Sequence, residues 1–435
     1  MQSKIPRWQS ISTCLTLFLA LRLWPYFHND IPLGYDPGLY RFAFTHFPFQ
    51  FQWLTSMYPP GLPFLVRLFH QETALIPLII TFSLLLFVSV YIFTYRYFGN
   101  KAAMWATFLL ACSLVQYRVY YWYYLKNIIA LAFLLLAMAS AMKKSYWTIF
   151  WGALVVYFHT PTDFILYAGL VSGALFMKNQ RRYYLSCLGL ILGLASPYLV
   201  ATFKNGYLPL LGNIVSSHGE PSGTFYEPAE ILVLSILYVP LGLIGFWKKW
   251  RFAPALVLPT IGLFITSLFQ LYFYRRLLIY LDLFLLIFAA SFIAQIKNKI
   301  LLTGYVIASL VYVVFFVKST AYPQIDPGEF QEIKSLQTVS ANSYLLVTDQ
   351  AYMPWAYGYS NHKVIAPGFG ENDIWTTAEW QRFWTGTLEE EINLLQNLPQ
   401  PLLIFHSDRQ PILPFVNDMQ CFDKLDWRTY VFVCN

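Results

Sequence analysis

The feature that most constrains this chain is a series of long, nearly uncharged apolar stretches that continues to about residue 317. A helix needs about 20 mostly apolar residues to cross a bilayer, and fewer where it is broken or buried among other helices. Only 12% of the 435 residues are charged, about half the share that is usual in soluble proteins. We therefore expect a polytopic α-helical membrane protein. Its candidate spans are 9–27, 74–95, 102–116, 125–142, 183–201, 230–247, 252–270, 277–296 and 300–317.

The stretch 146–177 is too long for one span, and the polar run from His159 to Asp163 interrupts its middle. Basic residues flank it on both sides, so both of its ends are expected to face the cytoplasm. Two short spans, 146–159 and 163–177, with the polar tip at the outer face meet this condition. The chain then has about eleven spans.

The charges between the spans predict the orientation. The loops on one side hold basic residues and no acidic one, and such loops face the cytoplasm. We expect the N-terminus in the cytoplasm and the first apolar stretch to be retained as a span rather than cleaved as a signal peptide. An odd number of spans places the C-terminus outside a plasma or inner membrane. The net charge of +7 follows from this orientation, so membrane lipids and not nucleic acid are the expected surroundings.

From Lys318 onward the composition becomes that of a soluble domain. Three short apolar runs are typical of buried strands: 343–349, 402–406 and 429–433. Because 378–397, between the first two, has a helical pattern, we predict a small extracytoplasmic α/β domain at 318–435. Residues 1–317 are then the transmembrane domain, with a long first outer loop at 28–73.

The outer domain contains two cysteines, Cys421 and Cys434. An outer compartment permits disulfides, so we predict a bond between them, with two free thiols as the alternative. Cys14, Cys112 and Cys187 fall inside predicted spans and are expected to be plain apolar residues.

The first outer loop is the most informative stretch for function. Asp36 is followed by Pro37 and Gly38, which predicts a tight turn that holds a carboxylate at the membrane surface. Further on, the run around Tyr58 is a second stiff, aromatic turn. Taken alone, both turns are also compatible with an ordinary loop.

The run Gly-Tyr-Asp-Pro-Gly-Leu-Tyr at 34–40, followed by Tyr-Pro-Pro-Gly from Tyr58, resembles the first loop of the GT-C superfamily of membrane glycosyltransferases. The resemblance also covers the outline of the whole chain: many spans, a long first outer loop and a C-terminal outer α/β domain. It implies a polyprenyl-phosphate sugar or polyprenyl-diphosphate oligosaccharide donor. It also implies that the first-loop acid, Asp36, is a catalytic base or metal ligand, with Tyr58 at the substrate.

One departure from that family concerns the second acid. Many relatives carry it after the third span, whereas the loop 117–127 here contains no carboxylate. Asp163, beside His159 at the tip between two spans, is the leading replacement, and His159 is a candidate substrate contact. The loop 202–229 supplies further candidates: His218, Glu220 and Glu227. Because a divalent ion needs several oxygen ligands, the identity and need of a metal stay open.

Cations at the outer ends of spans are candidates for binding a lipid phosphate. Arg275 and Arg276 open one span against the usual charge bias, and arginine grips phosphate oxygens with a planar fork. Lys126 opens another span after a run of aromatic residues, with simple snorkelling as its alternative. Asp282 lies about two turns inside its span. An acid there is a functional candidate, and a structural pair with an arginine is the alternative that we favour.

These features predict an integral-membrane glycosyltransferase that moves a sugar from a polyprenyl-phosphate donor to a glycan, lipid or protein acceptor at the outer face. Asp36 is the expected general base. The alternative is a transporter or flippase for a lipid-linked or anionic solute, because a broken helix, paired arginines and an intramembrane acid also suit transport. The absence of an internal repeat counts against that alternative.

Overall fold

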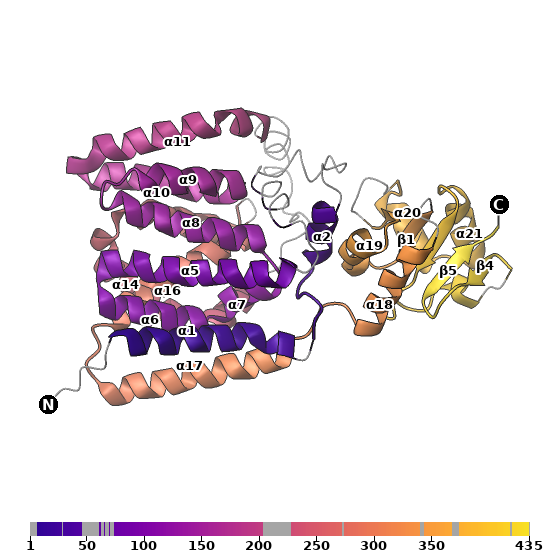
Figure 1. Cartoon of the computed structure of the whole chain (residues 1–435), viewed down its shortest axis with the longest axis horizontal. Coiled ribbons are helices and arrows are strands. Elements are labelled where there is room, and N and C mark those ends of the chain that lie inside the picture. Colours follow the sequence, from indigo (N-terminus) through magenta and orange to yellow (C-terminus); the bar gives the residue numbers. More distant parts are fainter. Residues whose placement is uncertain are drawn as a thin grey trace. The chain divides into compact units, whose positions relative to one another are not determined.

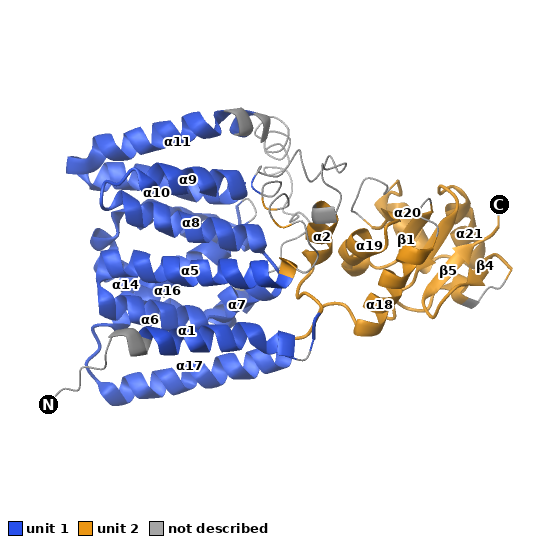
Figure 2. Cartoon of the chain, viewed as in Figure 1, with its two compact units in different colours: residues 1–30, 55–64, 76–321 blue, residues 31–54, 65–75, 322–435 orange. Residues whose placement is uncertain are grey.

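The computed structural model of the chain describes residues 7–27, 29–45, 61, 65, 69, 74–202, 228–271, 274–339, 343–367, 374–417 and 420–434. The chain forms two compact units (Figure 2). Unit 1 comprises the described parts of 1–30, 55–64 and 76–321, and unit 2 comprises those of 31–54, 65–75 and 322–435.

Unit 1 is a body of helices that lie side by side (Figure 1). α16 runs through its interior with most of its side chains buried, whereas α17 presents most of its side chains outward. The helices of unit 1 are α1 (Arg7–Leu23), α5 (Leu75–Phe98), α6 (Asn100–Cys112), α7 (Leu114–Tyr121), α8 (Leu125–Ala141), α9 (Trp147–Phe158), α10 (Thr160–Phe176), α11 (Arg181–Thr202), α13 (Pro228–Ser235), α14 (Val239–Lys249), α15 (Val257–Leu268), α16 (Tyr274–Ile293) and α17 (Lys299–Thr320).

Three helices in the described part of the chain are long and apolar enough to cross a membrane: α5, α16 and α17. Up to six spans result if each of three bent helix pairs counts as one span, and shorter apolar helices lie among them. The pairs bend by 54° between α6 and α7, by 117° after α10 and by 82° between α13 and α14. Unit 1 is therefore a helical membrane body, and the count of about eleven spans remains a prediction.

The polar run at 159–163 separates two helices. α9 ends at Phe158 and α10 begins at Thr160, with His159 in an extended conformation between them. Pro161 lies in the first turn of α10, where a missing backbone N–H costs no hydrogen bond. The helix boundaries therefore agree with the predicted spans 146–159 and 163–177.

Unit 2 contains a five-stranded sheet with the order β2-β1-β3-β5-β4. The central strand β1 (Tyr344–Val347) pairs in parallel with β2 (Lys363–Ile365) and with β3 (Leu402–Phe405). The other two strands, β4 (Phe422–Lys424) and β5 (Thr429–Phe432), extend the sheet beyond β3 in antiparallel pairings. The three predicted strand runs thus correspond to β1, β3 and β5, and the α/β character of this region is confirmed.

Four helices accompany this sheet: α18 (Pro327–Ser335), α19 (Met353–Tyr359), α20 (Thr377–Thr385) and α21 (Leu388–Gln396). Capping boxes begin α20 and α21, since Thr376 pairs with Glu379 and Thr387 pairs with Glu390. Each box satisfies backbone N–H groups that a helix start leaves open. The apolar faces of α20 and α21 contribute to the core of the unit, in which Phe383 is fully buried.

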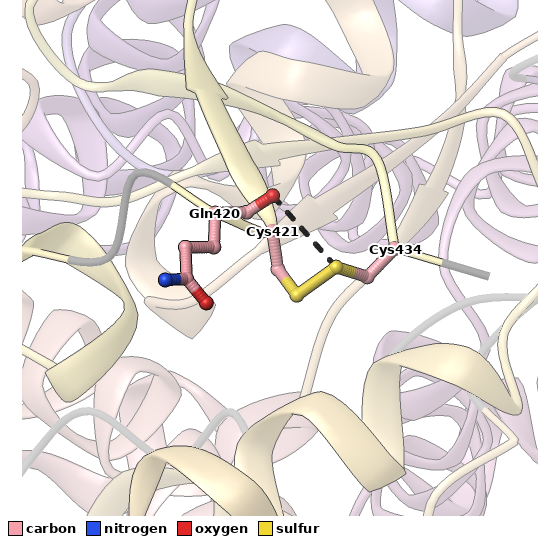
Figure 3. Close-up of a disulfide and its surroundings, with 3 residues drawn as sticks. All are labelled: Gln420, Cys421 and Cys434. Carbon is pink, nitrogen blue, oxygen red and sulfur yellow. Dashed lines mark hydrogen bonds between the residues drawn. A yellow bond between two sulfur atoms is a disulfide. The ribbon is translucent and has the colours of Figure 1, made fainter.

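Cys421 and Cys434 form a disulfide (Figure 3). The two residues flank the antiparallel pair β4–β5, and Cys434 Sγ lies 3.8 Å from the carbonyl oxygen of Gln420. Because β4 is the edge strand of the sheet, the bond ties the end of the chain to that edge. The predicted pairing is confirmed.

A helix from the first outer loop also belongs to unit 2. α2 (Pro37–Thr45) packs against α19. The Asp-Pro-Gly run, expected to be a tight turn, starts this helix: the carbonyl oxygen of Asp36 accepts a hydrogen bond from the N–H of Tyr40 at 3.1 Å. Aspartate is favoured at the N-cap and proline at the first helical position, so the same residues serve a helix start.

We predict that the stability of unit 2 falls as pH rises from about 4.5 to about 7. Burial raises the pKa of Glu391 from its ordinary 4.5 to about 7, although the N–H of Phe415 donates a hydrogen bond to its carboxylate. Below pH 4.5 this side chain is neutral in both the folded and unfolded states, whereas above pH 7 folding must bury its charge. Glu391→Gln should remove this dependence and raise the thermal unfolding midpoint of the full chain at pH 8.

The matched control is Glu389→Gln, because Glu389 is exposed on the same helix. Its midpoint should follow the wild-type pH profile. If Glu391→Gln keeps the wild-type profile as well, the raised pKa of Glu391 is refuted.

Candidate functional site

Asp36, the predicted base, lies at the N-cap of α2 and is partly exposed. The preceding Tyr35 donates a hydrogen bond from its hydroxyl to the carbonyl oxygen of Gln350 at 3.1 Å. Burial, and then the charges of Asp36 and Asp349, raise the pKa of Tyr35 above its ordinary value. Asp349 follows β1, so a second carboxylate from the C-terminal sheet shares these surroundings, and the sequence patterns did not indicate it.

The helix breaks of unit 1 bring together a cluster of neutral polar groups around His159. The Nδ1 atom of His159 lies 2.9 Å from the hydroxyl of Thr162 and 3.0 Å from the hydroxyl of Tyr280. The hydroxyls of Thr162 and Tyr280 are themselves 2.9 Å apart. Asn127, at the start of α8, donates a hydrogen bond to the Tyr280 hydroxyl at 3.4 Å. α8, α10 and α16 therefore meet in one polar cluster.

Two of the predicted phosphate-binding cations lie near that cluster. Lys126 and Arg276 both interact electrostatically with His159, and Arg276 also interacts with Tyr280. These cations come from α8 and α16, which are far apart in the sequence. The Nε of Arg275 donates a hydrogen bond to the hydroxyl of its neighbour Tyr274 at 3.4 Å, and its guanidinium lies 5.9 Å from that ring's centroid.

Asp163 lies in the first turn of α10 and is completely buried. Within the described residues neither oxygen of its carboxylate has a hydrogen-bond partner. Its position in the first turn places it where the helix dipole favours a negative charge. Asp163 also interacts electrostatically with Tyr280, so it borders the cluster around His159.

Asp282 is held differently from the expected pair with an arginine. One carboxylate oxygen accepts a hydrogen bond from the Tyr238 hydroxyl. The other accepts from the Gln116 amide at 2.8 Å and from the Ser113 hydroxyl at 3.5 Å. Ser113 separates α6 from α7, and Tyr238 precedes α14, so neutral groups from two broken helices surround this carboxylate.

Four predicted site residues lie outside the described residues: Tyr58, His218, Glu220 and Glu227. Within the described part of the chain, no three His, Cys, Asp or Glu side chains gather as a metal centre would require. Asp36 and Asp349 are two carboxylates, and no third such ligand joins them among the residues that the structure describes. The residues described here do not fit a divalent metal centre, and we derive no step through one.

No family model and no curated protein sequence matches the chain. Several solved structures match the chain. The chain is similar to the oligosaccharyltransferase AglB of Archaeoglobus fulgidus in complex with an inhibitory peptide and a dolichol-phosphate: 13% identity, TM-score 0.63, over 92% of this chain and 69% of that one. The same archaeal enzyme in complex with Zn and sulfate gives 14% identity and a TM-score of 0.58 over 91% of this chain and 68% of that one.

ArnT from Cupriavidus metallidurans matches over nearly the full length of both chains. The form bound to undecaprenyl phosphate gives 13% identity and a TM-score of 0.61, over 98% of this chain and 97% of ArnT. AglB and ArnT are both membrane glycosyltransferases of the GT-C superfamily. The chain therefore has the GT-C fold, and the predicted resemblance is confirmed at the level of the fold.

We predict that Asp282 is needed chiefly as a hydrogen-bond acceptor. Asp282→Ala removes this acceptor from the Gln116 amide and the Tyr238 hydroxyl, which keep the Ile279 carbonyl and the Ser113 hydroxyl as partners. Each lost hydrogen bond costs about 0.5–1.5 kcal/mol. Asp282→Asn keeps one acceptor oxygen and should be milder. Thermal unfolding of the purified protein in detergent should therefore rank wild type above Asp282→Asn, and Asp282→Ala lowest. Equal midpoints for the two variants would contradict the acceptor role.

Proposed function

We propose that this protein is a membrane glycosyltransferase that moves a sugar from a polyprenyl-phosphate donor to a hydroxyl acceptor on a glycan, lipid or protein. The observation that carries the proposal is the convergence of Lys126 and Arg276 on His159 within a GT-C fold. The similar structures of AglB and ArnT were solved with dolichol-phosphate and with undecaprenyl phosphate, respectively.

In this proposal Asp36 is the general base. Its carboxylate takes the proton of the acceptor group, and the acceptor atom attacks the anomeric carbon of the sugar. The bond between that carbon and the phosphate oxygen breaks, and the electron pair leaves with the polyprenyl phosphate. A base of this kind must lie within hydrogen-bond reach of the proton that it removes.

Lys126 and Arg276 would stabilise the leaving group. Negative charge grows on the phosphate as the glycosidic bond breaks, and fixed cations in an apolar body stabilise such charge more strongly than water does. His159 with the hydroxyls of Thr162 and Tyr280 adds hydrogen-bonding groups beside these cations. Arg275 is the next candidate along the same helix, and Asp163 borders the cluster as a second acid.

The predicted orientation completes the proposal. With about eleven spans and a cytoplasmic N-terminus, transfer takes place at the outer face of a plasma or inner membrane, and unit 2 is extracytoplasmic. The disulfide between Cys421 and Cys434 supports that placement, because such bonds persist in oxidising compartments.

The alternative function is transport or flipping of a lipid-linked or anionic solute. The bends between α6 and α7 and between α13 and α14 favour it, since transporters place their sites at broken helices. The polar side chains at these two bends, Ser113 and Tyr238, bind Asp282. A glycosyltransferase and a flippase differ in the fate of the sugar–phosphate bond, and that difference separates the two functions.

We predict that Asp36→Asn lowers turnover about 100- to 10,000-fold, the usual contribution of a general base. Asparagine has nearly the same shape but cannot accept the proton. Donor binding and thermal stability should stay at wild-type levels. The assay measures transfer of radiolabelled sugar by protein reconstituted in vesicles, and full activity in Asp36→Asn would exclude this residue as the base.

Asp30→Asn is the matched control, because Asp30 is an exposed carboxylate six positions earlier. Its turnover should equal that of the wild type. A loss in both variants would point to a general effect of charge in this loop and not to base catalysis.

We further predict that Lys126→Gln and Arg276→Gln each lower kcat/KM for the donor by about tenfold or more, the scale of one charge-assisted hydrogen bond. Lys299→Gln is the control, since Lys299 is exposed at the start of α17. Kinetics with varied donor concentration distinguish the three variants. Wild-type kinetics for both Lys126→Gln and Arg276→Gln would remove the phosphate site from the mechanism.

A further inference from the structure

The segment that contains Asp36 is anchored to unit 2 on both sides of the carboxylate. Before it, the Tyr35 hydroxyl donates a hydrogen bond to the carbonyl oxygen of Gln350. After it, α2 packs along α19. The carbonyl oxygen of Asp36 accepts a hydrogen bond from the Tyr40 N–H in the first turn of α2. Movement of α2 on α19 would therefore move Asp36.

Two glycines allow the backbones of α2 and α19 to touch. A Cβ atom added to Gly38 would collide with the carbonyl group of Pro354, and one added to Gly358 would collide with the backbone of Gly38. These atoms belong to the main chain and cannot rotate away. A side chain at either position requires the two helices to separate, which is why only glycine allows this approach.

The charged side chain of Arg41 also holds α2 against α19. Its side chain is buried, and its guanidinium donates a hydrogen bond to the carbonyl oxygen of Gly358 near the end of α19. The guanidinium also lies 4.3 Å from the centroid of the Tyr359 ring, within the range of a cation–π interaction. Phe42 adds an edge-to-face contact with Tyr357 at 5.8 Å between centroids.

α19 is itself held firmly in unit 2. Trp355 is fully buried, and its ring packs against Phe330 of α18 with centroids 5.6 Å apart. The Tyr357 hydroxyl donates a hydrogen bond to the carbonyl oxygen of Val364 in β2 at 3.1 Å. The sheet and α18 therefore fix α19, and α19 presents a rigid surface to α2.

We propose that α19 positions the base of the reaction, and that Gly38, Arg41 and Gly358 are positioning residues that act through Asp36. This inference rests on the proposed function of Asp36 and assigns a role to the C-terminal unit. Residues 322–435 of that unit do not supply the base; they fix the first-loop segment of the same unit, which carries it. A displacement of about 1 Å can cost about 100-fold in rate. We therefore expect a small separation of α2 from α19 to lower turnover strongly.

The test uses Gly38→Ala, Gly358→Ala and the double variant in the full-length protein. Each single variant should lower kcat by about 100-fold while the donor KM stays near wild type. The thermal midpoint should fall modestly, because separation of the two helices disturbs the packing of unit 2. Since both methyl groups disturb one contact, the double variant should be little worse than the worse single variant. Gly304→Ala is the control, because a Cβ atom at Gly304 meets no neighbouring atom within 4 Å.

A second measurement reports the docking itself. Amide hydrogen exchange of α2 is measured in the wild-type chain, and exchange should become faster when Gly358→Ala is added. Wild-type kcat in Gly358→Ala together with faster exchange overturns the positioning role. Wild-type kcat with unchanged exchange overturns the claimed steric constraint. Activity in Asp36→Asn is a separate result, which refutes the base and with it the proposed function.

Discussion

A backbone contact between α2 and α19 joins the first outer loop to the C-terminal α/β region and determines the position of the first-loop carboxylate within unit 2. Gly38 and Gly358 approach so closely that neither accommodates a Cβ atom, and Arg41 binds the carbonyl oxygen of Gly358. The run 34–40, which carries the first part of the first-loop resemblance, therefore packs as part of the α/β unit. In the proposed reaction, that unit holds the base.

A second constraint shapes the helical body. Polar groups in an apolar interior need partners within the protein, and the broken helices satisfy them with side chains from distant segments. Thr162 and Tyr280 surround His159, whereas Gln116 and Tyr238 bind Asp282. The cluster around His159 also has Lys126 and Arg276 beside it. The hydrogen-bond partners of Asp282 are neutral groups. This difference is the reason why we propose the phosphate site at the cluster around His159 and a structural role for Asp282.

Local patterns were sufficient for much of the fold. The apolar runs indicated a membrane body, the polar run at 159–163 marked a helix break, and apolar β-rich runs located three of the five strands. Contacts between distant segments could not be predicted, because a single sequence does not reveal which faces of its helices and strands pack together. The docking of α2 on α19, the partners of Asp282 and the proximity of Asp349 to Tyr35 all depend on such contacts. The Asp-Pro-Gly run predicts a turn but starts α2, because the same residues suit turns and helix starts equally well.

The fate of the labelled sugar tests most directly whether the protein is a glycosyltransferase. Purified wild-type protein in vesicles is supplied with a polyprenyl-phosphate sugar labelled in the sugar, and with candidate glycan, lipid and peptide acceptors. The account predicts protein-dependent cleavage of the sugar–phosphate bond, with the label on an acceptor and free polyprenyl phosphate released in equal amount. Intact labelled donor that only changes leaflet would contradict it and establish the protein as a flippase.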